Sequence, residues 1–139
     1  MSRVELLEVS DRWEVTLGGR SVTRCCVDHG VTLVLDDPDE AFEIRIEQPF
    51  ELHRAGDEVL IEPGGDPVKL APALALLGAQ VEKAVAFRDG RLLLRFRDGA
   101  EVRVFACQEF EPWTLVGPGG LRLVSMPGGE VAVWKPEIG

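Results

Sequence analysis

Apolar residues at every second position dominate the segment 81–104, VEKAVAFRDGRLLLRFRDGAEVRV. Leu92, Leu94 and Phe96 alternate with arginines and a leucine, as in a strand that buries one of its two faces. Asp-Gly dipeptides at 89–90 and 98–99 flank this run, and Asp-Gly tolerates the positive φ angles of a tight hairpin turn. The segment therefore predicts a three-stranded antiparallel meander with two short turns.

The same alternation predicts further strands on both sides of this meander. Before it we expect strands at 13–17, 21–27, 31–35, 42–46 and 59–61, with a hairpin turn at Gly18-Gly19 between the first two. Pro49 interrupts the pattern before Phe50 and Leu52, which predicts a bulge or a sheet edge there. After the meander we expect strands at 121–124 and 131–134.

One helix is expected, in the segment LAPALALLG. Leu70, Leu74 and Leu77 would share one face of it, and Gly78 would end it. Pro72 fits only the first turn of a helix, where its missing N–H has no partner to lose. We therefore predict a short apolar helix at 69–77 that plugs the core.

The two halves of the chain share a pattern. Residues 31–37 match 92–98, residues 44–46 match 102–104, and Phe50-Glu51 matches Phe110-Glu111. We expect an α+β, predominantly antiparallel β fold in a single domain, 1–139, with a first β half at about 13–61, the helix at 69–77 and a second β half at 81–134. Pseudo-twofold packing of two similar meander halves would form a sandwich or a partly open barrel.

Charge excludes some classes of partner. The chain carries 24 acidic and 15 basic side chains, a formal net charge of −9. Such a field repels phosphate, so nucleic acid and anionic membranes are poor partners, whereas a basic protein partner, or simple solubility, suits it. No apolar run approaches the ~18 residues of a membrane span, and the first residues lack the basic and apolar regions of a signal peptide. We expect a cytoplasmic protein; homo-oligomerisation stays open.

Motifs for cofactors or metals are missing from the sequence. The glycines lie in turns, without the spacing of a nucleotide-binding loop before a helix. His29 and His53 are the only histidines, and neither belongs to an HExxH motif or a Cys/His quartet. The acidic run Asp36, Asp37, Asp39 and Glu40 lacks the residue order of an EF-hand, which favours a solvated loop. We predict no cofactor and no metal.

An enzyme is not favoured either. Cys25, Cys26 or Cys107 would need His29 or His53 beside it to act as a nucleophile, and no GxSxG elbow is present. Adjacent cysteines on a strand point to opposite faces, so one of the first two thiols should face the core and the other the outside. The three thiols are expected to serve as small hydrophobic residues. No catalytic residue is assigned.

Four side chains are candidates for partner binding. Glu109 and Glu111, two positions apart, would lie on one face of a strand. Trp113 and Trp134 lie near Gly/Pro turns, where each indole would either anchor the core or line a recognition patch. Glu111 beside Trp113 would supply the charge of such a patch.

With these features the chain resembles a family of small actinobacterial proteins that is known only as a domain of unknown function. The resemblance covers roughly residues 13–134 and rests on Leu76-Leu77-Gly78-Ala79, the Asp89–Gly99 meander, Phe110-Glu111-Pro112-Trp113, Pro127-Gly128-Gly129 and Trp134. Phe110 stands where the family usually has tyrosine, and Pro112 where a small residue is usual. The family has no established activity, so the resemblance implies little about function.

Two functional hypotheses follow. The first is a non-enzymatic, acidic, cytoplasmic protein-binding module, of which immunity- or antitoxin-like proteins are one type. The alternative is a small-ligand-binding β barrel or sandwich, which requires an apolar internal pocket of at least ~300 Å³ lined from both halves. An enzyme ranks third, because it would require clustered Cys/His or carboxylate groups in a cleft.

Overall fold

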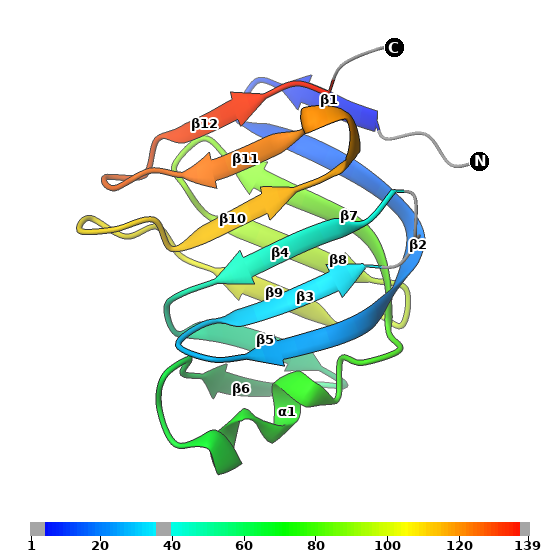
Figure 1. The fold of residues 1–139 in the computed structure, drawn as a ribbon, viewed down its shortest axis with the longest axis vertical. Helices are drawn as coiled ribbons and strands as arrows, with labels where there is room; N and C mark the ends of the chain where they lie inside the picture. The colour runs from blue at the N-terminus through cyan, green and yellow to red at the C-terminus, as the bar shows by residue number, and fades with distance from the viewer. Residues whose placement is uncertain (1–4, 36–39, 137–139) are drawn as a thin grey trace.

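The structure, a computed structural model, describes residues 5–35 and 40–136 (Figure 1). Asp36, Asp37 and Asp39 of the acidic run lie outside these residues. The described residues form a twelve-stranded sheet system, one short α-helix and two 3-10 helices. In chain order they are β1 Glu5–Val9, β2 Arg12–Val27, β3 Val31–Leu35, β4 Phe42–Ile46, β5 Phe50–Arg54, β6 Asp57–Ile61, η1 Pro67–Leu70, α1 Ala71–Leu74, β7 Gln80–Phe87, β8 Leu92–Phe96, β9 Glu101–Val104, β10 Trp113–Val116, η2 Pro118–Gly120, β11 Arg122–Ser125 and β12 Val131–Trp134.

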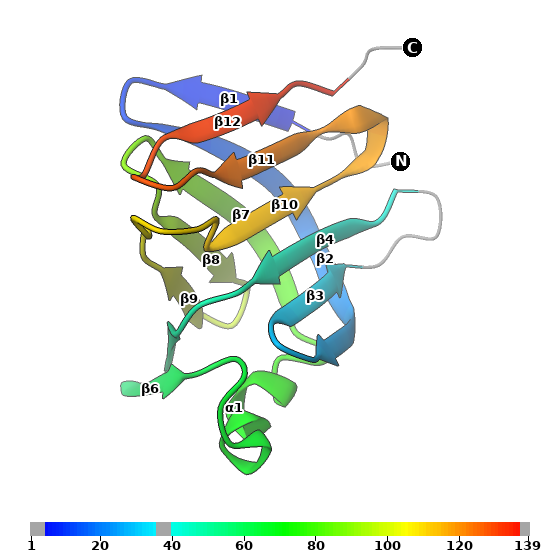
Figure 2. The same cartoon turned by 60° about the vertical axis from the view of Figure 1, so that its left-hand side comes forward.

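The strands form two layers that face each other across the core (Figure 2). One layer has the order β12-β11-β10-β4-β3-β2, and the other continues as β2-β7-β8-β9-β5-β6, with β1 also paired to β2. Every pairing is antiparallel, and the sheet does not close on itself. This confirms the predicted predominantly antiparallel β fold with one short helix.

Strand β2 belongs to both layers. Its first part pairs with β1 and β7, and its last part pairs with β3. Between Thr16 and Arg20 the pairing with β7 shifts register, and Gly18 and Gly19 have φ angles of +59° and +78°. The hairpin turn predicted here is wrong: the two glycines form a bulge that bends one continuous strand. A hairpin turn and a bulge both require residues with positive φ. The bulge forms here because β7 pairs with β2 on both sides of the two glycines.

The central meander is confirmed as β7, β8 and β9. Leu92, Leu94 and Phe96 are buried, as are Val102 and Val104 on the neighbouring strand. Side chains from both halves fill the space between the layers. The largest that are fully buried include Trp113, Phe42, Phe50, Leu17, Leu33 and Leu35.

The strand order contains the predicted internal repeat. The path β11-β10-β4-β3-β2-β7-β8-β9-β5-β6 is symmetric about the contact between β2 and β7, so β3 corresponds to β8 and β4 to β9. In the first half, Val31 pairs with Ile46. In the second half, Leu92 pairs with Val104 at the corresponding place. Register shifts also recur at corresponding points, after Val22 on β2 and inside β7.

The two halves exchange strands. From the first half, β5 pairs with β9; from the second half, β10 pairs with β4. Phe50 lies opposite Val104, and Trp113 lies opposite Ile46, the residue equivalent to Val104. Trp113 is therefore the counterpart of Phe50. The predicted match between Phe50 and Phe110 is wrong, because Phe110 lies in the exposed loop before β10.

The helical segment is shorter than the predicted helix at 69–77. It consists of η1 followed directly by α1. Buried side chains recur at every third residue, Leu70, Ala73 and Leu76, while Leu74 and Leu77 are exposed. The predicted leucine stripe is wrong because the segment begins as a 3-10 helix, which has three residues per turn. Its buried face joins the core, as expected of a plug. Within the described ranges, no helix is long and apolar enough to cross a membrane.

The turn between β7 and β8 is packed directly against the turn between β11 and β12. Gly90 has a φ angle of +98°, and a Cβ added to it would lie 2.6 Å from the carbonyl oxygen of Gly129. The carbonyl oxygen of Gly90 also accepts hydrogen bonds from Trp113 Nε1 at 2.8 Å and Ser125 Oγ at 2.9 Å. Gly90 therefore connects the two layers through its backbone.

Replacing Gly90 by alanine should destabilise the fold through this contact. The control is Gly99→Ala in the second Asp-Gly turn, where φ is +92° but an added Cβ would meet nothing within 4 Å. Both variants carry the strain of positive φ, so we expect Gly90→Ala to lower the free energy of unfolding by about 1–3 kcal/mol more than Gly99→Ala. Urea denaturation measures both, and equal losses would contradict the close approach.

Candidate partner-binding site

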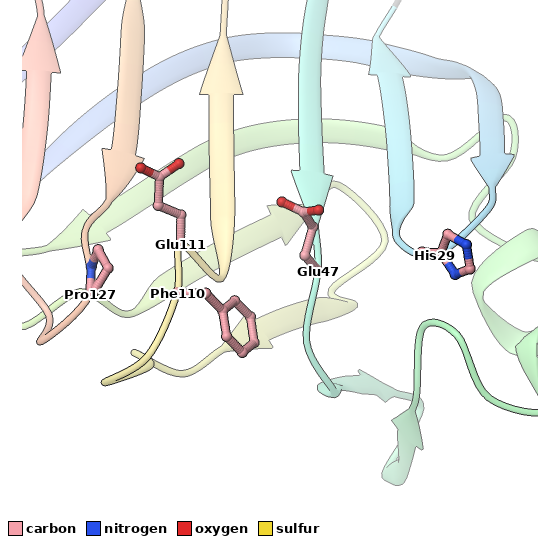
Figure 3. A pocket seen from close by; sticks show the side chains of 5 residues that line it. All are labelled: His29, Glu47, Phe110, Glu111 and Pro127. Carbon is pink, nitrogen blue, oxygen red and sulfur yellow. The ribbon is translucent and has the colours of Figure 1, made fainter.

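A hollow of about 590 Å³ lies where β4 ends and β10 begins. Figure 3 shows the carboxyl groups of Glu47 and Glu111 on either side of β10, with the ring of Phe110 lying between and below them. His29 and Pro127 stand at the two sides of this hollow. The site therefore combines two carboxylates with an exposed aromatic ring on a widely open surface.

Backbone contacts hold the loop that carries Phe110 and Glu111. On one side, the N–H of Glu47 donates to the carbonyl of Pro112 at 2.8 Å, and the side chain of Gln48 donates to the carbonyl of Phe105. On the other side, the N–H of Gly128 donates to the carbonyl of Cys107 at 2.8 Å. The loop between β9 and β10 is thus tied to both neighbouring segments.

The two carboxylates differ in their surroundings. Glu47 lies 3.5 Å from Nε of Arg45, which neutralises part of its charge. Glu111 is exposed and makes no ion pair with any described residue. Phe110 is 43% exposed although it is a large apolar side chain. Glu111 and Phe110 are therefore the groups of the hollow that are most available to a partner.

Asp28 orders the turn that carries His29. Its carboxylate accepts a hydrogen bond of 2.7 Å from the N–H of Gly30 and one of 3.0 Å from the guanidinium of Arg45. The bond from Gly30, and then the bond from Arg45, holds the pKa of Asp28 below its usual value. Arg45 thus links this turn to Glu47 across the end of β4.

The structure separates the four predicted partner-binding residues. Glu111 lines the hollow, and Glu109 is exposed on the same loop. Trp134 is 52% exposed beneath the guanidinium of Arg122, and it pairs with Arg122, which pairs with Val116 at the end of β10 remote from the hollow. Trp113 is fully buried, so of the two places expected for its indole it occupies the core. Its indole is a core anchor that hydrogen bonds to Gly90.

Sequence reasoning missed Glu47, Phe110 and the two residues at the sides of the hollow, His29 and Pro127. They come from four separate segments, and the pairing of β4 with β10 brings the central two together. One usable signal exists, since Gln48-Pro49 marks the end of a strand and so predicts exposed side chains at that position.

Among the described residues, no cysteine or serine hydrogen bonds to a histidine, so the pairing of a nucleophile with a histidine base is not formed there. Cys25 packs against the core, as predicted for one of the two adjacent thiols, and its sulfur lies 3.9 Å from the carbonyl oxygen of Ala73. Burial, and then the neighbouring Cys26, raises the pKa of the Cys25 thiol, so the nucleophilic thiolate is disfavoured.

A second hollow, of about 280 Å³, lies on the outer face of the meander. Three arginines and two phenylalanines contribute to its lining: Arg91, Arg95, Arg103, Phe87 and Phe105. Each guanidinium is within ion-pair distance of a carboxylate, with Arg91 beside Asp89 and the other two beside Glu101. This hollow, like the first, lies outside the packed core, whereas the small-ligand hypothesis requires an internal apolar pocket.

Comparison with known proteins identifies a family. A model described as Family of unknown function (DUF6188) matches residues 13–135, and the chain therefore belongs to this family. The match confirms the expected membership of a family without known activity; the actinobacterial origin stays a prediction. Searches among curated proteins and among solved structures found no match.

Replacing Trp113 by phenylalanine should weaken the contact between the layers. The variant loses the indole N–H that donates to Gly90 and leaves a gap in the core, so the free energy of unfolding should fall by about 1–3 kcal/mol. Trp134→Phe removes an indole from a half-exposed position and should stay within about 0.5 kcal/mol of the wild type. Urea denaturation followed by circular dichroism distinguishes them, and equal effects would contradict the anchoring role.

The variant Asp28→Asn should lower Tm at neutral pH, because the folded state stabilises the charged carboxylate. The pKa of Asp28 is lower in the folded than in the unfolded protein, so its contribution is complete above the unfolded value and is lost as pH falls through the folded value. The Tm difference from the wild type should therefore shrink below about pH 4. Asp57→Asn, which removes a carboxylate without hydrogen bonds to described residues, should leave Tm unchanged at pH 7. A difference that grows on acidification would contradict this assignment.

Proposed function

We propose that this member of the DUF6188 family is a non-enzymatic, cytoplasmic protein-binding module that receives lysine or arginine side chains of a basic protein in the hollow formed by Glu47, Phe110 and Glu111. The observation that carries the proposal is the position of an exposed phenylalanine ring between two carboxylates (Figure 3). The carboxylates would attract the cationic end of such a side chain, and the ring would contact its apolar stem or its charge.

The charge of the whole chain supports a basic partner. A net charge of −9 attracts a cationic protein over a distance of about a Debye length, ~10 Å at 0.1 M salt, and so accelerates association. Electrostatic steering of this kind gives fast, salt-sensitive binding. A basic toxin neutralised by an immunity- or antitoxin-type protein is one partner with this chemistry.

The construction of the loop supports a preformed surface. The backbone of the loop accepts a hydrogen bond from the N–H of Glu47 on one side and from the N–H of Gly128 on the other. The loop therefore needs little further ordering when a partner binds. A surface that is already ordered loses less conformational entropy when a partner binds. Phe110 supplies an aromatic contact of the kind that is enriched in the cores of protein–protein interfaces.

The test begins with affinity capture from the native cytoplasm, followed by purification of the captured protein and measurement of its Kd at low and high salt. We expect a basic partner whose affinity falls as salt rises. Glu111→Lys should weaken binding roughly tenfold at low salt, equivalent to about 1.4 kcal/mol, and should reduce the dependence on salt. Phe110→Ala should weaken binding at both salt concentrations.

The matched control is Glu43→Lys, which reverses an exposed charge on β4 four positions before Glu47, or about 13 Å along the strand. This variant changes the net charge as much as Glu111→Lys does, so it separates general attraction from contact in the hollow. Equal losses in the two lysine variants, or an unchanged Kd for Phe110→Ala, would refute the assignment of the hollow as the binding site.

A further inference from the structure

We propose that Glu51, His53 and Glu58 form a binding site for a divalent transition-metal ion of the Zn²⁺ class on the outer face of the β5–β6 hairpin. The site shares no residue with the hollow assigned to partner binding. It also lies outside what the sequence predicted, because neither histidine belongs to a recognisable metal motif.

The hairpin places three ligand groups together. Glu51 and His53 are two positions apart on β5, so their side chains leave the same face, and Glu58 lies directly opposite His53 on β6. One ligand atom from each of the three residues lies within 4.8 Å of the others. Nε2 of His53 is 2.9 Å from Oε1 of Glu51.

These separations are close to those of a metal centre. Tetrahedral zinc, with bonds of about 2.0–2.2 Å, sets its ligand atoms about 3.3 Å apart. The contact between His53 and Glu51 is already slightly shorter than this, and Glu58, an exposed side chain, can approach by rotation about its own bonds. An ion would replace the hydrogen bond between Glu51 and His53 and would receive one lone pair from each group.

The backbone beneath the ligands is fixed. Strand β5 pairs with β9 on one side and with β6 on the other, so neither Glu51 nor His53 lies on a free edge. Ala55 and Gly56, with φ angles of +52° and +84°, form the two-residue turn that joins β5 to β6. A turn this short sets the register of the hairpin and therefore keeps Glu58 opposite His53.

The surroundings admit a cation. A hollow of about 220 Å³, lined in part by His53, Glu58 and Glu101, gives water and ions access to the ligands. Arg103 lies opposite Glu51 on β9, but its guanidinium donates to Glu101 at 2.7 Å. Arg54 donates to Asp98 at 3.2 Å. Both neighbouring cations are thus paired with carboxylates other than the three ligands.

The ligand set selects the class of ion. Imidazole suits Zn²⁺, Co²⁺ and Ni²⁺, whereas Mg²⁺ and Ca²⁺ prefer sites made of oxygen atoms alone. Three protein ligands leave one tetrahedral position for water or for an exogenous group. The site therefore has the ligand count of an open zinc centre.

The test uses Zn²⁺ itself on the full chain after chelator treatment and dialysis. Two histidines give two sets of imidazole NMR signals, so the wild-type protein reports directly which ring binds. We expect one equivalent of Zn²⁺ to shift the signals of His53 and to leave those of His29 in place. A titration that moves His29, or neither ring, would overturn the proposal.

Calorimetric titration of variants provides the second measurement. His53→Gln and Glu58→Gln should each weaken Zn²⁺ binding by at least about tenfold, while the controls His29→Gln and Glu43→Gln should bind as the wild type does. All variants retain the three thiols, so a Zn²⁺ affinity unchanged by His53→Gln would place the ion elsewhere on the chain, the thiols included, and refute the site. The NMR titration uses the wild-type protein. It can therefore still refute the proposal if a variant fails to fold.

Discussion

The bend of β2 at Gly18-Gly19 is the constraint on which the architecture depends. A single strand can pair with β7 in one layer and with β3 in the other only if it changes direction between them. Gly18 and Gly19, with positive φ, bend β2 without ending it shortly before its partner changes, since Ser21 still pairs with β7 and Val22 begins the pairing with β3. All later strands extend outward from β2 in one sheet or the other, and the core fills the space between the two sheets.

Local patterns predicted the hairpins well, because their determinants are close together in the chain. The meander of β7, β8 and β9 follows from alternation and two Asp-Gly turns, and the first-half hairpin of β3 and β4 follows from the same alternation. The role of Gly18-Gly19 was missed because it depends on β7, about sixty residues later. The predicted buried face of the helix is wrong because it assumes α-helical periodicity, whereas the segment begins as a 3-10 helix with three residues per turn.

Neither the hollow nor the proposed metal site could be predicted in full from the sequence, because strand pairing brings their residues together. Glu111 was recognised by its charge, but Glu47 reaches it only through the pairing of β4 with β10. Glu51, His53 and Glu58 match no motif, because a hairpin register rather than a helical spacing brings them together. Trp113 and Trp134 look alike in the sequence, yet one is an anchor of the core and the other lies on a terminal strand of the sheet, so composition could not distinguish them.

The exchange of strands between the halves also affects the growing polypeptide on the ribosome. The outer edge of β4 has no partner until residues 113–116 have been synthesised, and the β5–β6 hairpin must wait for β9. A nascent chain that ends before β10 therefore exposes an unpaired edge next to apolar side chains, a typical starting point for aggregation. The repeat thus makes the two halves mutually dependent, and the native sheet is completed only after β10, β11 and β12 have been synthesised.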